Sequence, residues 1–219
     1  MPSPFDQSTY QVRLDWGTAG LARLASADVV VVVDVLRFSS TVVDAVASGV
    51  DVQLAEAEGW SRNGAAVAAA ATSDATVLIG GIRNAAAVAR AVQTIQERRQ
   101  ARTSVAVIAA GEVDADGSPR FAVEDQLGAG AIVLALSDRG IDHTTPDAAV
   151  AAEGFRALRG ALRHMIGASG SGRELAAGVA ATARIEASGL VPTSTTDAAV
   201  LDAVDVVPVL RDGSFTAFD

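Results

Sequence analysis

The sequence predicts an α/β protein with a mostly parallel sheet, helices on both faces, a C-terminal helical layer and a closing β-hairpin. Strand-like apolar runs alternate with helical segments over roughly the first 140 residues, which is typical of this class. The run at 28–34, DVVVVVD, is β-branched and uninterrupted, as expected of a central parallel strand covered on both sides. Two apolar segments around Asp212-Gly213 predict the hairpin at 206–218.

The remaining elements follow from apolar periodicity and from turn residues. In the first half we expect strands at 10–15, 50–54 and 76–79, and helices at 17–25, 39–48 and 64–71. In the second half we expect helices at 84–100, 124–136, 146–166 and 173–187, a strand at 104–110, a loop at 112–120 and a flexible link at 167–172. No linker divides the chain, so residues 1–219 are interpreted as one domain that is mainly helical from about Pro146.

Composition excludes several classes of protein. The formal net charge is −9, which argues against nucleic acid because binding to it needs many contacts from Lys and Arg to phosphate. Cysteine is absent, so disulfides and thiolate metal sites are excluded. We see no signal peptide and no apolar run near the ~20 residues that span a bilayer, so we expect a cytoplasmic protein without membrane contact. A small anionic substrate held by a few arginines remains compatible with the charge.

Polar residues gather where the central strand ends. Asp34 is the first charged residue after the valine run, and a carboxylate there needs a partner, a metal ion or water. Arg37, Ser39, Ser40 and Thr41 follow, and the hydroxyls can cap the next helix. Ligands of open α/β sheets bind at the carboxyl ends of strands, so this is the candidate active site. The alternative is an ordinary helix cap in which Asp34 pairs with Arg37.

A second acidic group lies at the start of a later predicted helix. Glu124 and Asp125 suit the positive end of a helix dipole, and in many proteins such a pair is only a surface feature. Mg²⁺ prefers carboxylate oxygens, however, so Asp34, Glu124 and Asp125 together could supply a three-carboxylate site.

Two further pairs lie at predicted helix starts. Asn63-Gly64 and Arg83-Asn84 could bind an anion through backbone N–H groups, and the Arg83 guanidinium could clamp phosphate. An ordinary turn and an ordinary cap are the alternatives. His143 and His164 are isolated in the sequence and carry no catalytic pattern.

Taken together, the motifs resemble the 2-phosphosulfolactate phosphatase (ComB-like) family. The order and spacing match in the stretches VDVLRFSSTVVDAVASG, SRNGA, VLIGGIRNAAAVARAV, AAGE and FAVEDQLGAGAIV. The resemblance covers most of the chain. It implies a cytoplasmic, Mg²⁺-dependent phosphatase that hydrolyses phosphate esters of small 2-hydroxy acids, with 2-phospho-3-sulfolactate as the named substrate, in coenzyme M biosynthesis. It also implies a homo-oligomer.

The resemblance places the candidate residues, except Arg83, on signature positions of the family, and our hypothesis assigns the following roles to them and to Arg83. Asp34, Glu124 and Asp125 would bind Mg²⁺, and Arg37, with Arg83, would neutralise the phosphoryl group. The remaining signature positions would contact substrate or phosphate, and they are Ser39, Ser40, Thr41, Asn63, Gly64 and Asn84. Whether Asp34 acts as base or nucleophile is left open.

Two departures from the family pattern affect the wall of the expected pocket. Only Ala55 to Trp60 separate Leu54 from Ser61, which is shorter than the family's glycine-rich segment, and the turn Ser61-Arg62-Asn63 lacks two threonine hydroxyls. A catalytically impaired homologue that binds an anionic metabolite is therefore the alternative. A Rossmann-type binding module ranks third because the glycine fingerprint is absent.

Overall fold

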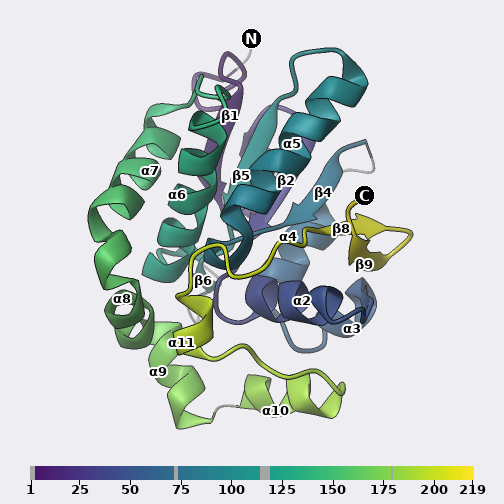
Figure 1. Ribbon diagram of the computed structural model, residues 1–219, viewed down its shortest axis with the longest axis vertical. Coiled ribbons are helices and arrows are strands. Elements are labelled where there is room, and N and C mark those ends of the chain that lie inside the picture. Colours follow the sequence, from purple (N-terminus) through teal and green to yellow (C-terminus); the bar gives the residue numbers. More distant parts are fainter. Residues whose placement is uncertain (1–2, 72–73, 114–118, 179) are drawn as a thin grey trace.

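A single mixed sheet with helices on both faces forms the body of the molecule in this computed structural model (Figure 1). The structure describes residues 3–71, 74–113, 119–178 and 180–219. The strands are β1 (Val12–Trp16), β2 (Val29–Val33), β3 (Val52–Gln53), β4 (Thr76–Ile79), β5 (Val105–Ala109), β6 (Glu112–Val113), β7 (Pro119–Arg120), β8 (Pro208–Arg211) and β9 (Ser214–Ala217).

The helices before residue 140 are α1 (Gly17–Arg23), α2 (Phe38–Ala47), α3 (Leu54–Ala57), α4 (Gly64–Ala70), the 3₁₀ turn η1 (Ile82–Asn84), α5 (Ala85–Arg99) and α6 (Val123–Ser137). Those after it are α7 (Pro146–Leu158), the 3₁₀ turn η2 (Arg159–Ala161), α8 (Leu162–Ala168), α9 (Gly170–Ala177), α10 (Ala180–Ala187) and α11 (Thr195–Ala198). None of the helices in the described ranges has the length and apolar character to cross a bilayer.

The strand order is β1-β5-β2-β4-β8-β9-β3, and the predicted fold class is confirmed. Strands β1, β5, β2 and β4 pair in parallel, whereas β8, β9 and β3 extend the sheet with antiparallel pairing. The central position of β2 agrees with its valine run, because parallel strands are covered on both faces. All five valines of β2 are buried.

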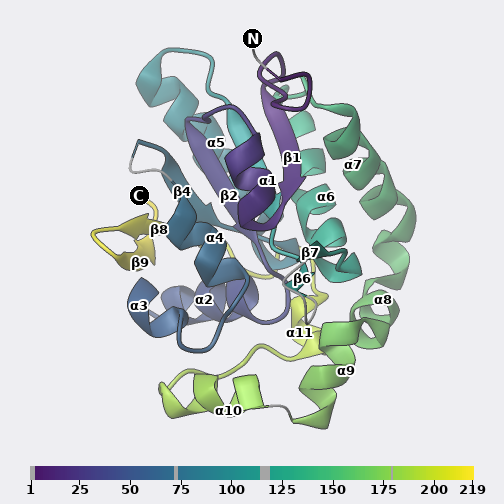
Figure 2. The same ribbon diagram turned by 180° about the vertical axis from the view of Figure 1, so that it is seen from behind.

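Side chains of β2 alternate between two apolar cores. Val29, Val31 and Val33 pack into one core with α5, α6 and α7, while Val30 and Val32 pack into the other with α2 and α4. This alternation follows from the two-residue period of a strand. Figure 2 shows α1 and α4 on the face opposite to α5 and α6.

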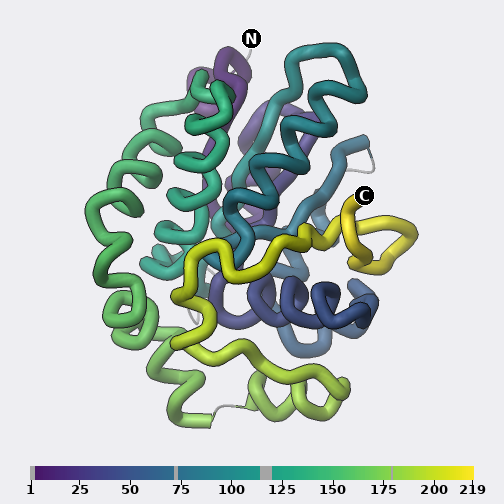
Figure 3. Tube along the Cα trace, in the orientation of Figure 1, coloured from purple at the N-terminus to yellow at the C-terminus, as the bar shows by residue number. Residues whose placement is uncertain are grey.

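The predicted closing hairpin is confirmed. Strands β8 and β9 pair across Asp212-Gly213, and β8 pairs with β4 through Leu78 and Val209. The chain after α10 runs back from the helical layer to the sheet before forming this hairpin (Figure 3). Residues near both ends of the sequence therefore share one sheet.

The predicted long helix at 146–166 is wrong in one respect, since it is broken into α7, η2 and α8. Gly160 lies inside the break. Glycine in a helix interior costs roughly 0.5–1 kcal/mol relative to alanine, which makes this a weak point for a continuous helix. On either side of it, Phe155 of α7 and Ile166 of α8 remain buried in the same core.

The segment at 167–172 is a tight helix corner, so the predicted flexible link is wrong. Ser169 ends α8 and caps α9, because its hydroxyl accepts a hydrogen bond from Gly172 N (3.1 Å) and donates one to Ile166 O (2.8 Å). A Cβ on Gly172 would lie 2.1 Å from Ile166 O, so only glycine fits this corner. The predicted helix at 173–187 is divided between α9 and α10.

The predicted loop at 112–120 contains a small hairpin. Strands β6 and β7 pair antiparallel, with Glu112 opposite Arg120. Residues 114–118 lie outside the described residues. The hairpin matters for the site because it begins directly after the carboxyl end of β5.

The close crossing of α6 and α7 generates a stability prediction. A Cβ on Gly130 of α6 would lie 2.1 Å from Ala151 O of α7, so we expect Gly130→Ala to force the helices apart. Overpacking of this kind costs about 1–3 kcal/mol, and each kcal/mol lowers Tm by roughly 2–4 °C in a domain of this size. Thermal and urea unfolding measure the effect.

Gly154→Ala in α7 is the matched control, because an added Cβ there meets nothing within 4 Å. Removing a glycine from a helix then raises the free energy of unfolding by roughly 0.5–1 kcal/mol. Equal stability of the two variants would contradict the close packing at Gly130.

Candidate active site

A cleft of about 620 Å³ opens at the carboxyl ends of the parallel strands. Its first wall is formed by residues that come after β2 and after α3 in the chain. Its second wall is formed by residues of β6 and of the α9–α10 region. Polar and aromatic residues on the first wall are Asp34, Arg37, Phe38, Trp60, Ser61, Arg62 and Asn63. Those on the second wall are Glu112, Ser171, Glu174 and Arg184. Asp34 and Arg37 of the predicted site thus share one cleft.

Asp34 is the buried carboxylate of this cleft, with 7% of its surface exposed. Its Oδ2 accepts a hydrogen bond from Gly64 N (3.0 Å) at the start of α4. Its backbone N–H donates to the Ser39 hydroxyl (2.9 Å), which holds the turn between β2 and α2. The carboxylate is therefore fixed between two helix starts.

Burial raises the pKa of Asp34 to about 6 from its ordinary value of 3.8. The hydrogen bond from Gly64 opposes this shift, while the negative charges of Glu112 and Glu124 add to it. Glu112 follows β5 directly and its carboxylate accepts a hydrogen bond from the Ser171 hydroxyl on α9. Asp34 and Glu112 thus line the same cleft, together with a third carboxylate, Glu174.

Asp125 is a structural brace behind the cleft. Its Oδ1 accepts from Val35 N (2.7 Å) and its Oδ2 accepts from Gly111 N (2.9 Å), so one carboxylate joins the loops after β2 and β5. The residue is 2% exposed, and burial together with the charges of Asp34 and Glu124 raises its pKa well above the ordinary value. Glu124 is also 2% exposed, and neither residue lines the cleft.

The predicted three-carboxylate Mg²⁺ site is not assembled. Among the described residues, no group of three or more His, Cys, Asp or Glu side chains is placed to hold a metal ion. The reason is that Asp125 faces backbone amides, whereas Asp34 faces the cleft. Mg²⁺ commonly uses one or two carboxylates and completes its shell with substrate phosphate and water. Asp34 and Glu112 fit that smaller requirement.

Arg37 is the first residue before α2 and lines the cleft beside Asp34. Its Nη1 is buried and has no hydrogen-bond partner among the described residues. Arg62 and Arg184, at the same cleft, form no ion pair with any described carboxylate. Three guanidinium groups of an acidic chain therefore remain available to an anion here.

The hydroxyls predicted to contact substrate point into the protein. Ser39 Oγ donates to Val32 O (3.2 Å) and Ser40 Oγ donates to Val35 O (2.8 Å). Thr41 Oγ1 accepts from Thr193 N (3.5 Å). These three side chains are buried and shape the turn after β2, and none lines the cleft.

Asn63 lines the cleft and Gly64 lies directly behind Asp34, but neither provides the predicted anion site. Gly64 N is used by Asp34, and a Cβ there would lie 2.4 Å from the Phe38 ring. Asn63 Nδ2 donates to Gly111 O (2.8 Å), and Asn63 Oδ1 is buried without a partner among the described residues. The Asn63 side chain therefore offers an acceptor, which suits a donor better than a phosphate oxygen.

Arg83 and Asn84 lie away from the cleft. The Arg83 guanidinium donates to Asp44 Oδ1 (2.6 Å) and to Asp197 O (2.5 Å), which ties α2 and α11 to η1. Asn84 is fully buried, and its amide contacts Gly81 N, Ile79 O and Val206 O. Both residues hold the fold together, and neither lines the cleft.

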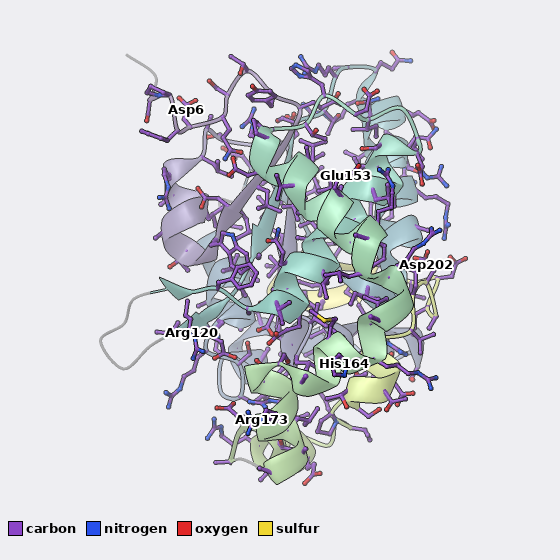
Figure 4. All side chains as sticks on the ribbon, turned by 90° about the vertical axis from the view of Figure 1, so that its left-hand side faces the viewer. Asp6, Arg120, Glu153, His164, Arg173 and Asp202 are labelled. Atoms are coloured by element: carbon purple, nitrogen blue, oxygen red, sulfur yellow. The ribbon has the colours of Figure 1, made fainter. Side chains whose placement is uncertain are left out.

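The two histidines also lie outside the cleft. His143 is exposed and stacks on Tyr10 with ring centroids 5.2 Å apart. His164 is exposed on α8 (Figure 4). The interpretation of both as residues without a catalytic pattern agrees with this placement.

Sequence reasoning missed several residues of the cleft. Glu112 follows the end of β5, so the same strand-end rule that selected Asp34 could have selected it. Trp60 had a weaker signal, as a lone aromatic next to the Asn-Gly turn. Ser171, Glu174 and Arg184 had none, because the α9–α10 region reaches the cleft only through tertiary packing.

Because the charge of Asp34 is buried, we predict that removing this charge stabilises the protein at neutral pH. Because the pKa of Asp34 is about 6 in the folded protein, its carboxyl is protonated and costs no stability below about pH 4. As the pH rises through about 6 the buried carboxyl ionises, and the free energy of unfolding falls. A shift of this size corresponds to about 3 kcal/mol. We expect Asp34→Asn to be more stable than the wild type by on the order of 1–3 kcal/mol at pH 7.5, and the difference to vanish near pH 4. Urea unfolding in EDTA measures both.

Asp28→Asn is a control of opposite sign. Burial alone would raise the pKa of Asp28, but hydrogen bonds from Ser104 and the charge of Arg99 outweigh it and lower that pKa. This variant should lose stability at pH 7.5 and approach the wild type on acidification. If Asp34→Asn behaved in the same way, the buried-charge account of Asp34 would be wrong.

The family of the chain follows from comparison with known proteins. A search of curated proteins gave no significant match. A family model described as 2-phosphosulpholactate phosphatase matches residues 60–213, which include β4, β5, α6 and the whole C-terminal layer. Residues 34 and 37 lie before the matched range. The chain belongs to the 2-phosphosulpholactate phosphatase family.

Proposed function

We infer that this protein is a Mg²⁺-dependent phosphatase that hydrolyses phosphate monoesters of small 2-hydroxy acids, such as 2-phospho-3-sulfolactate. The observation that carries the proposal is the meeting of Asp34 and Arg37 in one cleft at the end of the central parallel strand. Family membership supports phosphatase chemistry of this kind. A volume of about 620 Å³ suits a small ligand.

Arg37 would bind the phosphoryl group. A guanidinium offers several donors in a planar array and stabilises the charge that develops on phosphoryl oxygens. The unpartnered Nη1 supports this role, because no described residue competes for it. Arg62 and Arg184 at the same cleft raise the local positive potential, which attracts an anion despite the net charge of −9.

Asp34 would act as general base. A base works best when its pKa lies near the operating pH, and a pKa of about 6 meets that condition. In the proposed step a water oxygen forms a bond to phosphorus and one water proton passes to the Asp34 carboxylate. The bond from phosphorus to the ester oxygen breaks with its electron pair on that oxygen, which takes a proton from solvent.

Glu112 is the cleft carboxylate that would hold Mg²⁺ together with substrate, because Asp34 serves as the base. When bound, the ion would neutralise charge on the phosphoryl oxygens. Glu112 is fixed by the Ser171 hydroxyl, so α9 would take part in positioning this carboxylate. Asp125 would act indirectly by fixing the loops that carry Asp34 and Glu112.

The test is release of inorganic phosphate from 2-phospholactate and 2-phospho-3-sulfolactate, with and without Mg²⁺. We expect Mg²⁺-dependent release by the wild type and loss of release in Asp34→Asn. Equal rates for the wild type and Asp34→Asn would refute the site. A catalytically impaired homologue would instead show stabilisation by phosphate or sulfonate compounds without turnover.

A pair of arginine variants separates the site from the scaffold. Arg37→Gln should lower kcat/KM by about a hundredfold or more, because it removes donors to charge in the transition state. Arg83→Gln should cost about 1–3 kcal/mol of stability through loss of its contacts with Asp44 and Asp197, with kcat/KM nearly unchanged. Similar kinetic losses in both variants would place Arg83 in the site after all.

A further inference from the structure

Unpaired polar atoms concentrate at the proposed cleft. Within the described ranges, four buried side-chain nitrogen or oxygen atoms have no hydrogen-bond partner. Three of them, Arg37 Nη1, Trp60 Nε1 and Asn63 Oδ1, belong to residues that line the cleft. The fourth, Thr182 Oγ1, belongs to a residue that does not. Native proteins rarely bury polar groups without partners, so this concentration needs an explanation.

Trp60 is the residue of this group that no role yet explains. It is 5% exposed, and its ring packs on Phe38 with centroids 5.8 Å apart. That packing accounts for the apolar part of the indole and leaves Nε1 unused. A buried indole N–H ordinarily has an acceptor, and the described residues supply none. An oxygen of an anionic ligand is the acceptor that the arginines of this cleft would attract.

Asn63 has the opposite polarity. Its Nδ2 is bound to Gly111 O, and this fixes the amide so that Oδ1 is the free atom. Asp34, whose carboxylate accepts a hydrogen bond from the backbone N–H of Gly64, the residue after Asn63, is a second acceptor in the same cleft. A water molecule has two hydrogens to donate and can serve both acceptors, which leaves a lone pair for attack. The donors Arg37 and Trp60 complement this pair of acceptors.

We propose that Trp60 Nε1 binds a phosphoryl oxygen beside Arg37, and that Asn63 Oδ1 accepts a hydrogen bond from the attacking water. The inference rests on the proposed function and deepens it, because it assigns a donor side and an acceptor side to one cleft. The three atoms are shielded from bulk solvent, so ligand entry requires small rotations of the lining side chains. The environment of Trp60 must therefore change when phosphate binds.

Trp60 can be observed directly because the chain has only two tryptophans, Trp16 and Trp60. Trp16 packs on Phe121 and does not line the cleft, so it is an internal control. Titration of ¹⁵N-labelled protein with inorganic phosphate should move the Trp60 indole proton downfield and leave that of Trp16 in place. Trp16→Phe and Trp60→Phe assign the two signals.

Variants test the two sides separately. Trp60→Phe keeps an aromatic ring against Phe38 and removes the donor, so we expect phosphate affinity to fall about tenfold to a hundredfold, while the smaller ring lowers Tm by only a few degrees. Asn63→Leu should lower kcat by at least about tenfold while phosphate affinity stays near that of the wild type. Thr182→Val, which removes the fourth unpaired atom, should change neither quantity.

The outcomes separate this inference from the proposed function. Turnover by the wild type with an unmoved Trp60 signal at saturating phosphate would overturn the inference and leave the function intact. A moved Trp60 signal without turnover would support the donor side and overturn both the proposed function and the role of Asn63. A parallel fall of affinity and stability in both variants would reduce Trp60 and Asn63 to packing residues.

Discussion

The carboxylate of Asp125 joins two loops that are far apart in sequence, and the geometry of the cleft depends on it. One oxygen holds Val35 N after β2 and the other holds Gly111 N after β5. Asp34 and Glu112 directly adjoin these two amides. Because parallel strands end at the same edge of a sheet, a single buried acceptor can set the spacing of both carboxylates. The same burial raises the pKa of Asp125, so the brace is made at an electrostatic cost.

Negative charge at this edge is offset by local donors more than by ion pairs. Asp34 is held by Gly64 N and Asp125 by two backbone amides, and no described cation pairs with either. The arginines of the cleft remain unpaired nearby. A site with uncompensated charges of both signs is suited to a charged ligand, as the proposed phosphate ester would be. We expect the buried charge of Asp34 to lower the free energy of unfolding at neutral pH, as is common where function and folding compete.

The sheet could be predicted from sequence because its signals are local. The valine run of β2, the turn at Asp212-Gly213 and the strand-end position of Asp34 each need only neighbouring residues. Partners of polar side chains could not be predicted, since they depend on distant segments. Arg83 and Asn84 have the residue types of an anion site, but Asp197 O and Val206 O occupy their donors. The hydroxyls of Ser39 and Ser40 are unavailable to a ligand for a different reason, because they bond to the backbone of their own turn.

The shortened segment between Leu54 and Ser61 illustrates how structure changes the meaning of a sequence departure. The sequence alone suggests that this shortening removes part of the pocket wall. In the structure the segment begins with α3 and places Trp60 at the cleft. Trp60 packs on Phe38, and Phe38 packs on Phe215 of the closing hairpin with ring centroids 5.7 Å apart. This wall is therefore anchored through aromatic contacts to β9 of the closing hairpin. A short connection with a rigid aromatic anchor orders fewer residues than a long loop, and it can present a donor to the ligand at a lower entropic cost.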